Sequence, residues 1–219
     1  MTLRSLYKQN HYFFIGYFIL VAIAIYILIF YSKADGFFLM NPYHSTLLNY
    51  FFIPYTYVGD GFFIIALAVV LFFLKRKYLS LMIVSSYLLS GIFAQVLKYF
   101  ISEARPAYFL ENTNYPYFIE NVTLHNYHSF PSGHATSVFA LAAVLSFSVK
   151  NKNYSILFLL LAALVGYSRL YLGQHFIDDV FPGSFFGVMS AIICWIYFEK
   201  FFKKILKMNN LKSDLETIK

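Results

Sequence analysis

Hydrophobic residues make up 60% of the 219-residue chain and charged residues only 12%, with a formal net charge of +7. A soluble domain carries about 25% charged residues, so this composition excludes an ordinary water-soluble fold and indicates an integral membrane protein. The length allows a single domain, which we place at residues 1–219. The positive charge does not indicate nucleic-acid binding, because the basic residues are scattered between apolar stretches.

Six apolar stretches predict an all-α bundle of six transmembrane helices. The runs are long and continuous and lack the alternation of a membrane β-barrel strand. The fourth and fifth runs have only fifteen residues, so they reach the ~20 residues that span a bilayer only if adjacent polar residues continue the same helices. In chain order, the predicted spans are 12–31, 55–74, 78–97, 135–149, 154–168 and 180–198.

The basic residues predict the orientation of these spans. With the N-terminus inside, thirteen of the seventeen Lys and Arg residues fall on the inner side. Positive residues gather on the cytoplasmic side of membrane proteins, so both termini are predicted to be cytoplasmic. The four basic residues left on the outer side are Lys33, Lys98, Arg105 and Arg169, and only Lys33 belongs to no motif.

The first motif follows the third span. Lys98 and Arg105 are seven residues apart, which is two helical turns, so they could share one face of a helix. Pro106 disfavours helical backbone at Arg105, so we expect the helix to end there and present the guanidinium beyond it. The alternative is that both are cations that reach from a span end to the interface.

The second motif, Pro131-Ser132-Gly133-His134, precedes the fourth span. Serine is a favoured helix N-cap, and glycine lets the backbone approach a ligand closely. Free N–H groups at a helix start bind phosphate, and His134 in the first turn would face it. The alternative is an ordinary capped helix start.

The third motif closes the fifth span at Arg169 and continues to His175 and Asp179, which stand four residues apart. On a helix such residues share a face, so Asp179 could accept a hydrogen bond from the His175 ring. That bond would fix the tautomer and leave the other ring nitrogen free to attack. Asp178 would point about 100° away and face water. The alternative is a His–Asp pair with a purely structural role.

A histidine-rich metal site is the competing interpretation. His125, His128 and His134 could supply the three protein ligands of a catalytic zinc ion. Their spacing fits no common zinc pattern, and residues 112–129 read as an irregular loop. We therefore expect no metal ligands and no cofactor.

Taken together, the three motifs resemble those of the type 2 phosphatidic acid phosphatase superfamily, which includes membrane lipid phosphatases, soluble acid phosphatases and vanadium haloperoxidases. The matching stretches are KYFISEARP, PSGH and SRLYLGQHFIDD, and they cover the core 98–179. The resemblance implies that Lys98, Arg105 and Arg169 bind a phosphate, with Ser132 and Gly133 as further donors.

The resemblance also assigns the chemical roles. It implies that His175 is the nucleophile that forms a phosphohistidine, that Asp179 orients it, and that His134 protonates the leaving oxygen. It implies that hydrolysis needs no metal ion.

The sequence therefore predicts a metal-independent lipid phosphate or pyrophosphate phosphatase, with its site on the outer face of a bacterial plasma membrane. Its expected partners are a lipid phosphate substrate and the surrounding membrane lipids. Candidate substrates are undecaprenyl pyrophosphate, phosphatidylglycerol phosphate, phosphatidate and lipid A phosphates. A phosphotransferase with a lipid or sugar acceptor, and a catalytically silent lipid-binding protein, are the alternatives.

Overall fold

The computed structural model describes residues 2–113, 115–120, 122–198 and 201, and this part of the chain is helical without any strand. The elements are α1 (Leu3–Gln9), α2 (His11–Phe30), α3 (Lys33–Met40), α4 (Thr46–Tyr55), the 3₁₀-helix η1 (Thr56–Gly59), α5 (Gly61–Phe73), α6 (Lys77–Phe100), α7 (Pro106–Phe109), α8 (Gly133–Ser148), α9 (Tyr154–Tyr171), α10 (Ile177–Ile193) and the π-helical continuation η2 (Cys194–Phe198). The all-α prediction is therefore confirmed for the described residues.

Four to five of the six predicted spans qualify by length and apolar character in the described residues. The helices α2, α6, α9 and α10 with η2 are long and apolar enough to cross a membrane. The pair α4–η1 and α5 would make a fifth, but it is bent by 62°. Helix α8 is apolar but has only 16 residues. The prediction of six spans is thus supported only in part.

The second predicted span is not one straight helix from residue 55. Asp60 caps α5, because its Oδ1 accepts a hydrogen bond of 2.7 Å from the Phe62 N–H. A capping aspartate has non-helical backbone, so the chain changes direction there. Residues 55–59 consequently belong to the end of α4 and to η1.

Helix α8 lies at the centre of the bundle, packed against α6, α9 and α10. Twelve of its sixteen residues are buried, as expected of a helix that is apolar on all sides. Helix α10 approaches it closely, since a Cβ built on Gly187 would collide with the backbone carbonyl of Thr136. This tight core holds the start of α8 in a fixed position relative to α9 and α10.

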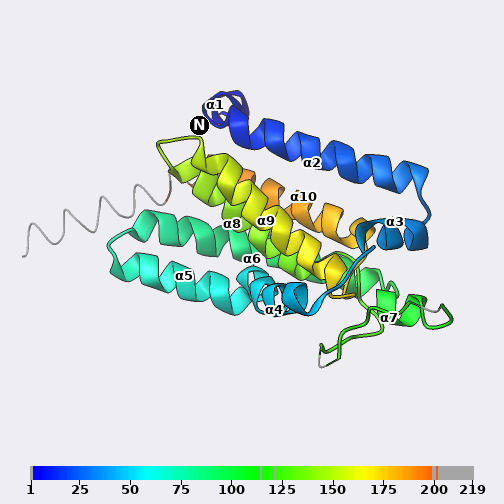
Figure 1. The fold of residues 1–219 in the computed structure, drawn as a ribbon. Helices are drawn as coiled ribbons and strands as arrows, with labels where there is room; N and C mark the ends of the chain where they lie inside the picture. Colours follow the sequence, from blue (N-terminus) through cyan, green and yellow to red (C-terminus); the bar gives the residue numbers. More distant parts are fainter. Residues whose placement is uncertain (1, 114, 121, 199–200, 202–219) are drawn as a thin grey trace, which may run out of the picture.

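The three motif segments lie at one end of the bundle, as the sequence predicts. Figure 1 shows α3, α4, α7 and the irregular residues 110–113, 115–120 and 122–132 together at this end. The N-terminus and the α8–α9 turn lie at the opposite end. Helix α2 runs along one side of the bundle, against α9 and α10. The C-terminal residues 202–219, and with them one of the two termini of the topology prediction, lie outside the described residues.

Candidate active site

The first motif leaves its helix earlier than predicted. Helix α6 ends at Phe100, so Lys98 is in its last turn, whereas Arg105 has extended backbone with φ −85° and ψ 163° directly before α7. The expectation of one shared helical face is therefore wrong. The extended backbone of Arg105 is what the following proline favours. The segment pairs instead with the loop before α8, through hydrogen bonds from Arg105 N to Asn126 O (2.8 Å) and from Ser129 N to Glu103 O (3.1 Å).

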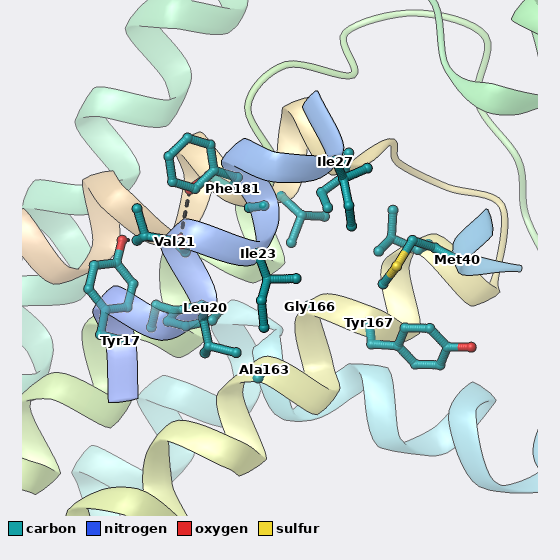
Figure 2. A pocket seen from close by; sticks show the side chains of 16 residues that line it. Tyr17, Leu20, Val21, Ile23, Ile27, Met40, Ala163, Gly166, Tyr167 and Phe181 are labelled. Carbon is teal, nitrogen blue, oxygen red and sulfur yellow. Dashed lines mark hydrogen bonds between the residues drawn. The ribbon is translucent and has the colours of Figure 1, made fainter. Parts of the chain in front are cut away.

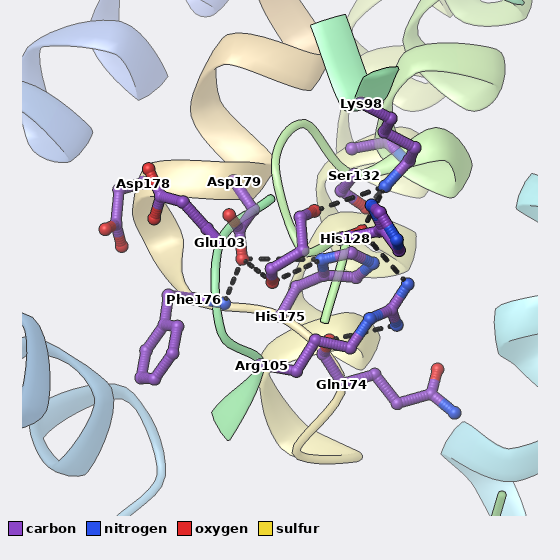
Figure 3. A network of polar contacts seen from close by, with 12 residues as sticks. Lys98, Glu103, Arg105, His128, Ser132, Gln174, His175, Phe176, Asp178 and Asp179 are labelled. Atoms are coloured by element: carbon purple, nitrogen blue, oxygen red, sulfur yellow. Dashed lines mark hydrogen bonds and ion pairs between the residues drawn. The ribbon is translucent and has the colours of Figure 1, made fainter. Parts of the chain in front are cut away.

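This pairing brings the two cations of the motif together on one loop carbonyl. Lys98 Nζ donates to His128 O at 2.5 Å, and an Nη of Arg105 donates to the same oxygen at 3.4 Å. Arg105 Nε also donates to Tyr127 O at 3.1 Å. Figure 3 shows Lys98 and Arg105 on one side of the His175 ring and Asp179 on the other.

The second motif forms the capped helix start that the sequence predicts. Ser132 is the N-cap of α8, and its Oγ accepts a hydrogen bond from Ala135 N at 3.4 Å. Ser132 N donates to Asp179 O at 3.0 Å, which fastens this cap to α10. His134 lies in the first turn. A Cβ built on Gly133 would meet no atom within 4 Å, so the backbone here is open to a ligand.

The third motif places Arg169 in the last turn of α9, as predicted. Its side chain is only 5% exposed, and one Nη donates to Thr56 Oγ1 of η1 at 2.7 Å. Its Nε is buried without a partner among the described residues. Because a buried guanidinium nitrogen is costly without an acceptor, this donor is suited to an anionic ligand.

His175 and Asp179 meet as predicted, but not through a shared helix. His175 precedes the N-cap Phe176 of α10, and its Nδ1 lies 3.4 Å from Asp179 Oδ2. Gly173 ends α9 with a φ of +63°, which favours glycine, and the chain turns back so that His175 N donates to Arg169 O at 3.2 Å. The turn, rather than helical periodicity, places the ring beside Arg169.

Asp179 is held by contacts that the sequence did not reveal. Its Oδ2 accepts hydrogen bonds from Phe176 N (2.8 Å) and from Ser129 Oγ (2.5 Å). The first bond satisfies a free N–H at the start of α10. Ser129 lies just outside the second motif, in a segment that reads only as irregular loop. No sequence signal distinguishes it from other loop serines.

Asp178 does not simply face water, which corrects the prediction. Lys33 Nζ contacts Asp178 Oδ2 at 2.9 Å and Glu103 Oε2 at 2.5 Å, and it lies 4.8 Å from the centre of the Phe176 ring. Although burial alone would lower the pKa of Lys33, its hydrogen bonds to Glu103 and Asp178 raise it. Lys33, the outer cation that belongs to no motif, thus ties α3 to the first and third motifs.

Comparisons with known proteins identify the family of this chain. Residues 77–203 match the family model of the PAP2 superfamily. The chain belongs to the PAP2 superfamily. Of the curated relatives, the lipid A 4'-phosphatase of Porphyromonas gingivalis is 34% identical over 57% of this chain and 55% of its own length. The phosphatidylglycerophosphatase B of Bacillus subtilis is 27% identical over 66% of this chain and 72% of its own length.

Two crystal structures share the fold of this chain. Aquifex aeolicus LpxE is 30% identical, with a TM-score of 0.63, over 75% of this chain and 95% of that one. The transmembrane PAP2 type phosphatidylglycerolphosphate phosphatase of Bacillus subtilis is 22% identical, with a TM-score of 0.62, over 88% of this chain and 96% of that one. The chain spans about half the length of the first curated relatives it matches. These relatives and the long apolar helices identify an integral membrane protein.

The His175 ring sits in a strongly positive, buried environment. The residue is 2% exposed. Burial, followed by the charges of Arg169, Arg105 and Lys98, holds the pKa of His175 well below its usual range. The ring is therefore neutral near pH 7, and one of its nitrogens keeps a free lone pair.

This buried neutral ring predicts a loss of stability in acid. Below pH 6.5 an unfolded chain protonates His175 but the folded one does not, so the free energy of unfolding should fall as the pH drops from 7 to 5. The slope from one such group is at most about 1.4 kcal/mol per pH unit. Thermal unfolding of the detergent-solubilised protein measures it. The His175→Asn variant should show a shallower pH dependence, and equal slopes in both proteins would contradict the assignment.

The histidine-rich metal site finds no support in the described residues. No three His, Cys, Asp or Glu side chains of this part of the chain come together in a way that could hold a metal ion. His125 and His128 lie on the irregular segment, where they line a hollow beside Arg105.

Two further cavities lie within the bundle. One, of about 140 Å³, lies between α2, α9 and α10 and is walled almost wholly by carbon (Figure 2). The Tyr17 and Ser184 hydroxyls in its wall are hydrogen-bonded to each other at 3.2 Å. It offers no charge to a phosphate. The other, of about 180 Å³, is more polar and adjoins His134, with Tyr87 and Gln95 of α6 in its wall.

Proposed function

We propose that the chain is a lipid phosphate phosphatase that hydrolyses a phosphomonoester or a pyrophosphate through a phosphohistidine on His175. The observation that carries the proposal is the setting of this ring. It is buried and neutral, its Nδ1 faces Asp179, and the charges of Lys98, Arg105 and Arg169 all act on it. Three cations around a neutral nucleophile suit attack on a phosphate, because phosphoryl transfer depends on positioning and charge stabilisation.

The proposed phosphate site combines side chains with backbone. Lys98, Arg105 and Arg169 supply the positive charges. The hydroxyl of Ser132 and the backbone N–H of Gly133, which has no acceptor within the helix, supply further donors at the start of α8. A close pair of opposite charges contributes ~4 kcal/mol before desolvation at an effective dielectric near 20. Together the cations offset the negative charge that would otherwise repel a nucleophile.

The proposed reaction has two steps. In the first, the free His175 nitrogen bonds to phosphorus, and the bond from phosphorus to the lipid oxygen breaks. His134 passes that oxygen a proton that it takes from the bound phosphate monoester, because burial and the charge of Arg169 lower its own pKa to about 3. In the second, water attacks the phosphohistidine, His134 accepts a proton, and inorganic phosphate leaves. Asp179 holds the ring throughout. This chemistry needs no metal ion.

The lipid part of the substrate is proposed to lie beside His134. The polar cavity there, between the start of α5, α6 and α8, adjoins the residue that would protonate the leaving oxygen. Relatives named for lipid A, phosphatidylglycerophosphate and undecaprenyl diphosphate support a substrate among these lipids, with phosphatidate as a further candidate.

Phosphotransfer remains the second candidate within the same chemistry, with a lipid or sugar hydroxyl in place of water. A silent lipid-binding protein is the third. It is disfavoured because it would not need a nucleophile, an orienting carboxylate and an acid in one place.

A panel of lipid phosphates tests the function. Detergent-solubilised protein should release inorganic phosphate from at least one of lipid A, phosphatidylglycerol phosphate, phosphatidate and undecaprenyl pyrophosphate, with EDTA present throughout. Release should be unchanged by EDTA because charged side chains occupy the role that a metal would have. Activity lost in EDTA and restored by a divalent ion would contradict the metal-free mechanism.

We further propose a single domain of six spans in a bacterial plasma membrane, with both termini cytoplasmic and the site outside. Six of the basic residues that support this orientation follow residue 198 in the sequence. They lie outside the residues that the structure describes. The described residues support the orientation in one respect: the motif segments and the N-terminus lie at opposite ends of the bundle (Figure 1).

Cysteine labelling checks the orientation. Asn112 is exposed at the motif end, and Asn151 is exposed in the α8–α9 turn at the opposite end. In a Cys194→Ala background, which removes the buried native cysteine, an impermeant thiol reagent should label Asn112→Cys in intact cells and leave Asn151→Cys unlabelled until the cells are lysed. The reverse pattern would invert the topology.

A further inference from the structure

Ser129 occupies the space between the two residues of the His–Asp pair. Its side chain is fully buried, with 0% exposure. Its Oγ lies 2.5 Å from Asp179 Oδ2 and 3.3 Å from His175 Nδ1. The direct separation between His175 Nδ1 and Asp179 Oδ2 is 3.4 Å. The hydroxyl is therefore slightly nearer to the ring than the carboxylate is.

The direction of the hydrogen bonds follows from the chemistry of the three groups. An ionised carboxylate only accepts, so the Ser129 hydroxyl donates its single proton to Asp179 Oδ2. The same Oγ then has lone pairs left, and it accepts from His175 Nδ1. With Nδ1 carrying the proton, the lone pair of the neutral ring is on Nε2.

Ser129 is itself held by the first motif. Its backbone N–H donates to Glu103 O at 3.1 Å, and Lys98 Nζ lies 3.4 Å from its carbonyl oxygen. The side chain of Glu103 is bound in turn by Lys33. The hydroxyl therefore reaches the third motif from a backbone position that the first motif fixes.

We propose that Ser129 is a positioning residue that fixes the tautomer and orientation of His175, so that Nε2 faces the phosphate. This inference rests on the proposed function. The two acceptors of the Nδ1 proton, Ser129 Oγ at 3.3 Å and Asp179 Oδ2 at 3.4 Å, both lie at the long end of hydrogen-bond distances. Neither acceptor alone therefore fixes the orientation of the ring strongly. Removing the hydroxyl takes away one acceptor from Nδ1 and one donor from Asp179, and the ring gains freedom to turn or to shift its proton.

Steady-state and single-turnover kinetics of Ser129→Ala test the inference on the lipid phosphate that the panel identifies. We expect kcat and the rate of phosphoenzyme formation to fall about 10- to 100-fold, by analogy with the loss of a hydrogen-bond partner that orients a metal-bound histidine. The KM for the lipid and the inhibition constant for inorganic phosphate should change less than about twofold, because Lys98, Arg105 and Arg169 remain. An unchanged kcat would overturn the inference.

A double-mutant cycle separates positioning from a general packing role. If Ser129 acts through the His–Asp pair, Ser129→Ala should cost much less in an Asp179→Asn background than in the wild type. Equal losses in both backgrounds would mean that Ser129 acts independently of the pair, which would also overturn the inference.

The matched control is Ser146→Ala. Ser146 is also fully buried, lies at the far end of α8, and has no hydrogen-bond partner for its Oγ among the described residues. This variant should keep the wild-type kcat. If Ser129→Ala does not yield folded protein, Ser129→Cys carries the same comparisons, because a thiol fills similar space but hydrogen-bonds weakly.

His175→Ala in the same series distinguishes the two possible failures. If His175→Ala is inactive and Ser129→Ala is fully active, only the role of Ser129 is wrong. If His175→Ala itself retains full activity, the proposed phosphohistidine mechanism fails, and the role of Ser129 fails with it.

Discussion

Replacing His175 with alanine should abolish phosphate release from every lipid phosphate that the wild-type protein hydrolyses. The side chain would supply the attacking nitrogen, and the cations around it, Arg169, Arg105 and Lys98, cannot attack phosphorus. Binding should persist, because Lys98, Arg105 and Arg169 stay in place. We therefore expect turnover to reach background while inorganic phosphate still protects the variant against thermal unfolding.

Two controls make this result specific. His125→Ala removes another histidine from the same end of the molecule, exposed on the irregular segment, and should leave turnover near the wild-type rate. Wild-type protein incubated with labelled substrate should retain label after an alkaline quench and lose it after an acid quench, as an acid-labile phosphoramidate does. Near wild-type turnover in His175→Ala would rule out the phosphohistidine mechanism for this chain.

Local patterns predicted the features that depend on neighbouring residues. The long apolar runs located the helices, because a membrane-spanning helix must satisfy its backbone internally and present carbon to lipid. Ser132 caps α8 and Arg169 closes α9, as their places next to apolar runs indicate. The pre-proline position of Arg105 predicted its extended backbone. Each of these features is decided within a few residues.

Features that depend on distant contacts could not be predicted in this way. Thr56 meets Arg169 across 113 residues, Lys33 meets Glu103 across 70, and Ser129 meets His175 across 46. The pairing of these residues exists only once the helices have packed. The bend before α5 also depends on context, since Asp60 reads from the sequence as one polar residue within an apolar run.

The turn before α10 shows how a correct pair can be predicted for the wrong reason. The spacing of His175 and Asp179 fits one helical face, but His175 lies outside the helix. Asp179 instead reaches back to the helix start, where its Oδ2 accepts the Phe176 N–H. The same carboxylate thus caps α10 and meets the ring, and this double role determines what its replacement should do.

Asp179→Asn should lower kcat strongly while the ring remains present. The amide has one acceptor oxygen where the carboxylate has two, and it carries no charge to hold the proton on His175 Nδ1. If that oxygen takes the Oδ2 position, the amide NH₂ occupies the place of Oδ1, which is buried without a partner among the described residues. A comparable substitution in a serine protease lowers turnover by about 10⁴, and we expect a loss of at most this size.

Asp178→Asn is the matched control, because it makes the same change one residue earlier in the same helix turn. Asp178 contacts Lys33 rather than the ring, and Lys33 keeps its bond to Glu103, so kcat should fall less than about tenfold. The two variants should bind inorganic phosphate with similar affinity, since neither loses a cation. If Asp178→Asn lowered kcat more than Asp179→Asn, the carboxylate that orients His175 would have been misassigned. This conclusion would hold whether or not His175→Ala is active.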